Sequence, residues 1–137
     1  MKIVLLLIIS LLSYLNTYAC VHGSVDKLFV GEGMIEDRLV LRECLLRKFI
    51  PSERSRVEVR KKVKLVFGEK YQAKEGEHER FDVVGISSEK YNHSILLYFI
   101  YDDNDMLIDV EVSYAFSKEN QPTGQPRHDE AQRAKEE

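Results

Sequence analysis

The chain has 137 residues, of which 44% are hydrophobic and 31% are charged, and its formal net charge at pH 7 is −3. One domain with a modest core fits this length, and the ordinary composition excludes a fibrous or wholly disordered chain. The negative net charge argues against a nucleic-acid-binding protein.

The first nineteen residues have the features of an export signal. Lys2 gives a short positive start, and the run IVLLLIISLL at 3–12 is apolar except for one serine. This run is shorter than the roughly 20 apolar residues of a membrane-spanning helix, but it suits a signal peptide. Thr17-Tyr18-Ala19 is an acceptable cleavage site. We therefore expect residues 1–19 to be a cleaved signal peptide and the mature protein to be exported.

Cys20 follows the expected cleavage site, and the chain has one other cysteine, Cys44. The sequence Thr17-Tyr18-Ala19-Cys20 matches the last two positions of a bacterial lipobox, in which the cysteine becomes the acylated N-terminus. A disulfide between Cys20 and Cys44 is the alternative, because export brings the chain into an oxidising compartment. From the residues themselves, both alternatives remain open.

The first part of the mature chain is interpreted as a tether and a helix. Residues 20–34 contain three glycines and predict a tether, with at most a short extended piece at 28–30. Residues 35–50 have the spacing of an amphipathic helix, which Pro51 ends. Cys44 lies nearly opposite the apolar stripe, so its thiol is expected to be accessible. The stripe comprises Ile35, Leu39, Leu41, Leu45, Leu46, Phe49 and Ile50.

A second helix is predicted from a capping signal. Ser55 and Glu58 have the spacing of a capping box, in which each side chain bonds the backbone N–H of the other residue. The helix then runs from about residue 56 and stops at Gly68. It presents Arg60, Lys61 and Lys64 on one side. On its other side it buries Val59, Val63, Val66 and Phe67.

Three strands are predicted after a polar loop at 69–79. They cover 80–86, 94–101 and 106–116, and the turn 102–105 joins the last two into a hairpin. In the last strand Asp109, Glu111 and Ser113 share one face. The other face comprises Ile108, Val110, Val112, Tyr114 and Phe116.

The predicted fold is α+β, a two-layer sandwich. Its single domain, 35–116, packs two N-terminal helices on one face of a three-stranded antiparallel meander. The other face of the sheet is left available. Residues 117–137 are polar and contain two of the three prolines, so a disordered tail is expected there.

Three segments of this domain carry a family resemblance. They are SRVEV at 55–59, VFGEKY at 66–71 and FIYDDNDMLIDV at 99–110. Together with the export segment and the element order, they resemble the small envelope lipoproteins of the SmpA/OmlA-like family, which includes outer-membrane assembly component E. The resemblance covers about 35–116. It implies a protein-binding domain and favours the lipid anchor at Cys20.

The sequence contains no motif typical of catalysis or metal binding. Its four histidines lie in the expected tether, tail and loops, and none has the spacing of a zinc site. A nucleophilic pairing of Cys44 with His78 or His93 has no local feature that would orient it. An acidic pair drawn from Glu77, Glu79 and Asp82 is expected to be solvated. We therefore expect no enzyme activity, no cofactor and no metal.

The first hypothesis is a non-enzymatic binding or scaffolding protein of the bacterial cell envelope, located in the periplasm or anchored at the outer membrane. Its partner would be another envelope or secreted protein, and a lipidated Cys20 would add contact with the membrane. Neither nucleic acid nor a small-molecule substrate is expected. The candidate surfaces are the free sheet face, the strand edges and the basic helix side with Arg60, Lys61 and Lys64.

The alternative is an immunity or inhibitor protein that neutralises a secreted toxin or enzyme. Charge is distributed unevenly, with ten Lys/Arg and five Asp/Glu over 36–64 but four and eleven over 69–116. Such asymmetry indicates either an interaction surface or elements that pack with complementary outer faces. In the first case Asp82, Asp109 and Glu111 would meet a basic partner.

Overall fold

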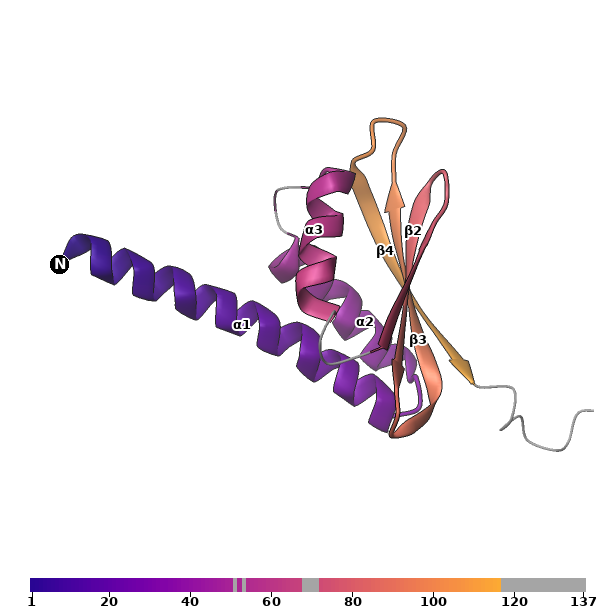
Figure 1. Cartoon of the computed structure of the whole chain (residues 1–137). Helices are drawn as coiled ribbons and strands as arrows, with labels where there is room; N and C mark the ends of the chain where they lie inside the picture. Colours follow the sequence, from indigo (N-terminus) through magenta and orange to yellow (C-terminus); the bar gives the residue numbers. More distant parts are fainter. Residues whose placement is uncertain (51, 53, 68–71, 117–137) are drawn as a thin grey trace, which may run out of the picture.

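A computed structural model of the whole chain describes residues 1–50, 52, 54–67 and 72–116. One layer is a four-stranded antiparallel sheet in the order β1-β2-β3-β4, and the other is helical (Figure 1). The strands are β1 Gln72–Glu77, β2 Phe81–Ser88, β3 Tyr91–Tyr101 and β4 Leu107–Phe116. The helical elements are α1 Lys2–Val30, α2 Ile35–Glu43, the π-helix η1 Cys44–Phe49 and α3 Arg56–Phe67. The α+β class and the antiparallel sheet are confirmed.

The expected tether is wrong over residues 20–30, because α1 runs unbroken to Val30. Val21, Val25, Leu28 and Phe29 have the i, i+4, i+7, i+8 spacing of one helix face, and each is at most 1% exposed. Their burial compensates for Gly23 inside the helix, a residue that costs about 1 kcal/mol there. These residues therefore belong to the core of the domain.

The first half of α1 is exposed. Figure 1 shows it projecting away from the sheet and the other helices. The helix is long and apolar enough to cross a membrane, and none of its most apolar 18-residue window is buried. An apolar helix at this position is compatible with a signal sequence or a membrane anchor.

The helix expected over 35–50 is divided into α2 and η1. Leu41, Cys44 and Leu45 are buried, whereas Ile35 and Leu39 of the predicted stripe are 66% and 54% exposed. A π-helix has more residues per turn than an α-helix, so the direction of successive side chains changes where α2 meets η1. An apolar stripe predicted with one constant period is therefore wrong on one side of this junction. For the same reason the expectation of an accessible Cys44 is wrong.

The α3 prediction is confirmed at its start and along its buried face. Ser55 Oγ accepts from the backbone N–H of Glu58 at 3.4 Å, while the Glu58 carboxylate pairs with Lys61. The expected end at Gly68 lies outside the described residues. Val59, Val63, Val66 and Phe67 are buried as predicted.

Strand β1 corrects the loop prediction over residues 72–77. It pairs with β2 in a register that sets Ala73 opposite Ile86 and Glu77 opposite Asp82. The segment QAKEGE lacks apolar alternation because it forms an edge strand, where charged side chains keep the open edge from pairing with other chains. Residues 69–71 and the expected tail, 117–137, are outside the described part.

The β3–β4 hairpin and its turn are confirmed. Asp102 Oδ1 accepts from the backbone N–H groups of Asn104 and Met106 at 2.9 and 3.0 Å. The register then shifts at Tyr101, so Leu107 takes the inward position expected of Ile108. Ile108 is 57% exposed, which corrects its predicted place on the buried face.

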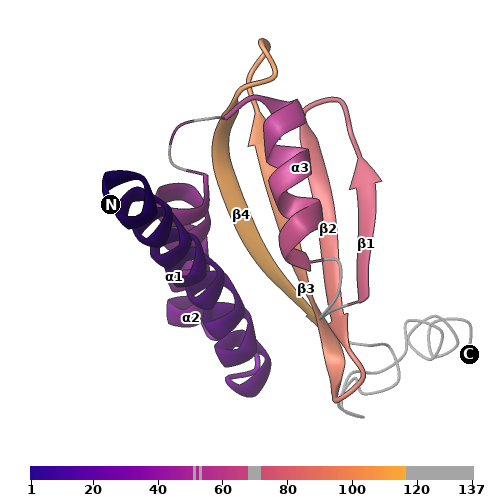
Figure 2. The same ribbon diagram turned by 60° about the vertical axis from the view of Figure 1, so that its left-hand side comes forward.

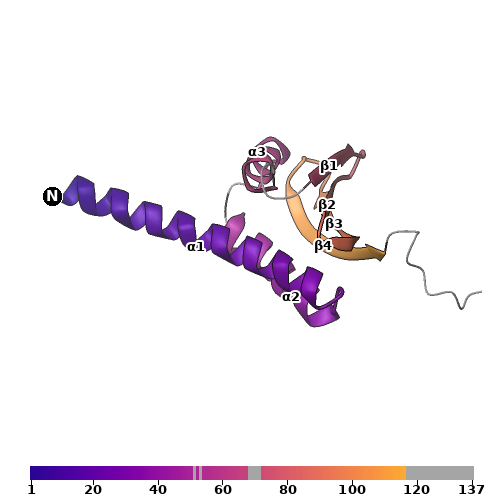
Figure 3. The ribbon, with the colours of Figure 1, turned by 60° about the horizontal axis from the view of Figure 1, so that its bottom comes forward.

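Figures 2 and 3 show how the layers meet. In Figure 2, α3 lies in front of the sheet and α1 and α2 lie beside β4. Figure 3 shows that these helices cover only one side of the sheet. Val84 and Ile86 of β2 point toward this helical layer, and so do the alternate residues of β3 from Ile95 to Tyr101. Among the described elements, none covers the other side, here called the outer face.

Candidate functional site

A buried ion cluster lies between α3 and the sheet. Asp82 points inward from β2 and is 7% exposed. Its carboxylate accepts from Arg56 Nη2 and from Arg60 Nε and Nη2, each at 2.8 Å. The two arginines are four residues apart, so α3 presents both guanidinium groups on the same side. One carboxylate thereby holds the start of α3 against β2.

Arg56 also fixes the β1–β2 turn. Its Nη2 donates to His78 O at 2.6 Å and its Nη1 donates to Glu79 O at 3.0 Å. The guanidinium carbon lies 4.8 Å from the centre of the Tyr101 ring, a cation–π contact. All these contacts are within the fold, which makes Arg56 a structural residue.

The charges in this cluster are set by its geometry. Burial favours a higher pKa for Asp82, but the hydrogen bonds and charges of Arg60 and Arg56 outweigh it and hold the pKa below its ordinary value. Burial and the charge of Asp82 raise the pKa of the Tyr101 phenol. Neither group titrates near neutral pH, as a general acid or base would. The cluster therefore links the start of α3 to the sheet through charged groups.

A small cavity lies beside the cluster, between α3 and strands β1 to β3. Its volume is about 130 Å³, and Val63, Phe99 and Tyr101 are among its lining residues. This volume is well below the roughly 300–1,000 Å³ of typical ligand pockets. Arg60, on its wall, is already paired with Asp82 and Glu77. The cavity is therefore smaller than a pocket for a drug-sized ligand.

The basic side of α3 is less free than the sequence suggests. Arg60 is committed to the buried cluster, and Lys61 Nζ lies 3.1 Å from a carboxylate oxygen of Glu58. Lys64 is exposed near the end of the helix. The three residues therefore share a helix, but they do not form a continuous free cationic surface.

The acidic residues proposed on β4 are also separated. Asp109 Oδ1 accepts from Arg42 Nη2 of α2 at 2.6 Å, so it joins the last strand to the helical layer. Glu111 is exposed on the outer face. Asp82, the third proposed acidic contact, is buried. The expectation of one acidic surface formed by Asp82, Asp109 and Glu111 is therefore wrong.

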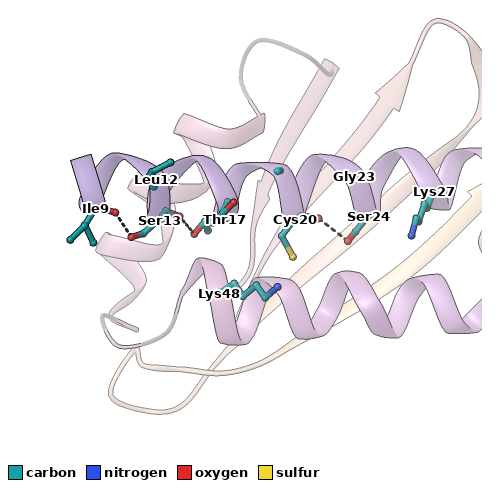
Figure 4. A pocket seen from close by; sticks show the side chains of 11 residues that line it. Ile9, Leu12, Ser13, Thr17, Cys20, Gly23, Ser24, Lys27 and Lys48 are labelled. Carbon is teal, nitrogen blue, oxygen red and sulfur yellow. Dashed lines mark hydrogen bonds between the residues drawn. The ribbon is translucent and has the colours of Figure 1, made fainter. Parts of the chain in front are cut away.

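The two cysteines are joined. Cys20 of α1 and Cys44 of η1 form a disulfide with their Cα atoms 6.1 Å apart. Figure 4 shows Cys20 on the side of α1 that faces the helix carrying Lys48. The shallow groove at this position contains Ser13, Thr17 and Ser24. Their hydroxyl groups donate to carbonyls of α1 itself, so they are satisfied without a ligand.

The residues considered for catalysis are not brought together. Cys44 has no free thiol, and the His78 ring stacks on Phe81 with ring centres 4.4 Å apart. His93 lies in another cluster of aromatic rings, where Nε2 is 3.0 Å from the Phe29 carbonyl oxygen. No cluster of three possible metal ligands occurs in the described residues.

The outer face of the sheet is an apolar surface of the domain that no described element covers. It carries Phe81 and Val83 from β2 and Leu96, Tyr98 and Ile100 from β3, all half-buried. The Phe81 and Tyr98 rings contact each other edge to face at 5.7 Å. Sequence reasoning left this face available without naming its residues. The signal was the segment SILLYFIY, which is apolar on both faces although helices cover only one.

These features together describe a small domain with a buried ion cluster, a disulfide and one apolar sheet face. Comparison with protein-family models, with curated proteins and with solved structures finds no match for this chain.

Proposed function

We propose that this protein is an exported, non-enzymatic protein-binding or scaffolding module of the bacterial cell envelope. The observation that carries the proposal is the outer face, where two aromatic and three aliphatic side chains gather. Exposed apolar patches rich in aromatic residues are typical of protein interfaces. The resemblance to small envelope lipoproteins agrees with this function.

Two features support export. The chain begins with an exposed apolar helix that follows Lys2, and its two cysteines are paired. Disulfides persist in oxidising compartments such as the periplasm. Exposure along α1 also changes at the proposed cleavage point, because burial in the core begins at Val21. Cleavage after Ala19 would therefore remove no buried residue of the core.

The disulfide bears on the mode of anchoring. Acylation at a lipobox forms a thioether on the cysteine sulfur, and Cys20 Sγ is already bonded to Cys44. We therefore favour a periplasmic protein that is not acylated at Cys20. The immunity or inhibitor alternative is less well supported, because Asp82 is buried and Asp109 is paired with Arg42.

The proposal is tested by capture on the outer face. A photoreactive residue replaces Leu96, the protein is expressed in its source cell, and crosslinked products are identified by mass spectrometry. We expect a protein adduct that is lost when Tyr98→Lys is added and retained with Val57→Lys. Val57 is 64% exposed on α3, which lies on the other side of the sheet. No adduct, or one indifferent to Tyr98→Lys, would refute the proposed function.

A further inference from the structure

We infer that the partner of the outer face is a second copy of this chain, bound about a two-fold axis parallel to the strands. The inference rests on the proposed function and names its partner. Its basis is the register of the four strands, which sets large side chains and opposite charges where such an axis needs them.

The central strands form rows of unequal side chains on the outer face. Val83 of β2 pairs with Tyr98 of β3, and Gly85 pairs with Leu96 in the next row. In both rows the large side chain belongs to β3 and the small one to β2. Over these two central rows the outer face is therefore raised along β3 and lowered along β2, whereas the next row reverses the order, with Phe81 on β2 and Ile100 on β3.

A two-fold axis parallel to the strands, between two such faces, places β3 of one copy over β2 of the other. Rotation about this axis does not move a residue along the strand direction. Tyr98 therefore meets Val83 of the second copy, and Leu96 meets Gly85 of the second copy. Each of these large-on-small contacts occurs twice, once on each side of the axis. Sheets stacked face to face adopt this nearly aligned arrangement, with an angle of about −30°.

The same axis pairs the outer strands β1 and β4. Lys74 is an exposed residue of β1 in the row of Gly85, Leu96 and Ser113. Glu111 is exposed on β4 in the neighbouring row, opposite Tyr98. In the dimer Lys74 lies over β4 of the second copy, one row from its Glu111 and within reach of a lysine side chain. Two symmetric charge pairs therefore border the apolar centre.

The size of the face sets the expected strength. Four strands and four rows cover about 15 Å by about 20 Å. This is about 300 Å² per copy and about 600 Å² for the pair, below the roughly 1,200 Å² of stable interfaces, so the association should be weak and concentration-dependent. We therefore expect a dimer that dissociates in the micromolar range.

Sedimentation equilibrium of the secreted, processed protein tests the inference between about 5 and about 500 μM, a range that brackets a micromolar dissociation constant. We expect a monomer–dimer equilibrium, weakened at least tenfold by Tyr98→Lys and unchanged by Val57→Lys. The Tyr98→Lys variant should fold, because the new lysine lies opposite Glu111 in its own sheet. Association through α1 would not respond to Tyr98→Lys, and that result would overturn the inference.

A charge exchange tests the axis itself. Lys74→Glu and Glu111→Lys should each weaken the dimer severalfold, and the double variant should recover the wild-type association. A wild-type protein that stays monomeric over the whole concentration range overturns the inference. This holds whatever else binds the outer face. If a different protein is then crosslinked at position 96, the proposed function stands without the dimer. If no protein is crosslinked, both fail.

Discussion

At the scale of single residues, Asp82 is the point where the helix and the sheet depend on each other. Removing its carboxylate leaves two guanidinium groups without their buried partner, and the Arg56 side chain is only 12% exposed. We expect Asp82→Ala to lower the free energy of unfolding by about 3 kcal/mol. Urea denaturation measures the change. Asp103, whose side chain is 94% exposed, supplies the matched control, and Asp103→Ala should cost less than about 0.5 kcal/mol.

The same carboxylate predicts a dependence of stability on acid. Because the pKa of Asp82 is lower in the folded protein than its ordinary value of 3.8, folding favours the ionised form. This contribution is complete above pH 3.8 and is lost as the pH falls through the lower, folded pKa. The stability difference between wild type and Asp82→Asn should therefore shrink below pH 3.8. An unchanged difference from pH 7 to pH 2 in urea denaturation would contradict the assigned shift.

The cluster also shows what single-residue patterns leave out. Asp82 is 26 residues from Arg56 and 22 from Arg60, so no local spacing connects them. Sequence reasoning treated Arg60 as a free surface cation and Asp82 as solvated. Only the packing of α3 across β2 gives these residues their shared role. By contrast, the cap of Ser55 on Glu58 spans four residues and was predictable.

At the scale of elements, the disulfide joins α1 to η1 across 24 residues. A crosslink of this span stabilises a fold by about 3 kcal/mol, chiefly by restricting the unfolded chain. We expect a reductant to lower the free energy of unfolding by this amount, as measured by urea titration. The Cys20→Ser/Cys44→Ser double variant should not respond to the reductant. The mass of the intact, non-reduced protein should be two hydrogens below that of the reduced chain, whereas a diacylglycerol increment on Cys20 would contradict this assignment.

The elements differ in how clearly the sequence specifies them. Strand β3 was predictable from its continuous apolar run, and the hairpin from the polar turn at 102–105 that follows this run. Strand β1 was missed, since an edge strand needs no apolar face and only its pairing with β2 defines it. The second half of α1 was missed because Gly23, with Gly31 and Gly33 just beyond the helix, suggested a tether. Val21, Val25 and Leu28 nevertheless already had helical spacing.

At the scale of the whole molecule, the helices and the sheet make one core, and α1 contributes to it from the far end of the sequence. Phe29 and Tyr91 of β3 stack with ring centres 5.4 Å apart. Gly33, at φ +76°, follows α1 and packs so closely on the Tyr114 ring that no side chain fits there. The first and last elements of the domain therefore meet at one end of the sheet.

This arrangement moves the start of the folding unit from Ile35, where the sequence placed it, to Cys20. A chain beginning at Cys20 keeps Val21, Val25, Leu28 and Phe29, each at most 1% exposed. Burial of four such side chains contributes roughly 6–10 kcal/mol, as much as the whole stability of a typical domain. We expect the chain from Cys20 to unfold cooperatively in a thermal melt followed by circular dichroism, and the chain from Ile35 to show no transition. The control is Cys20→Ser in the chain from Cys20, which lacks the disulfide but should still unfold cooperatively. With this result, loss of the disulfide alone does not explain why the chain from Ile35 fails to fold. A cooperative transition in that shorter chain would show that α1 is the accessory segment that the sequence predicts.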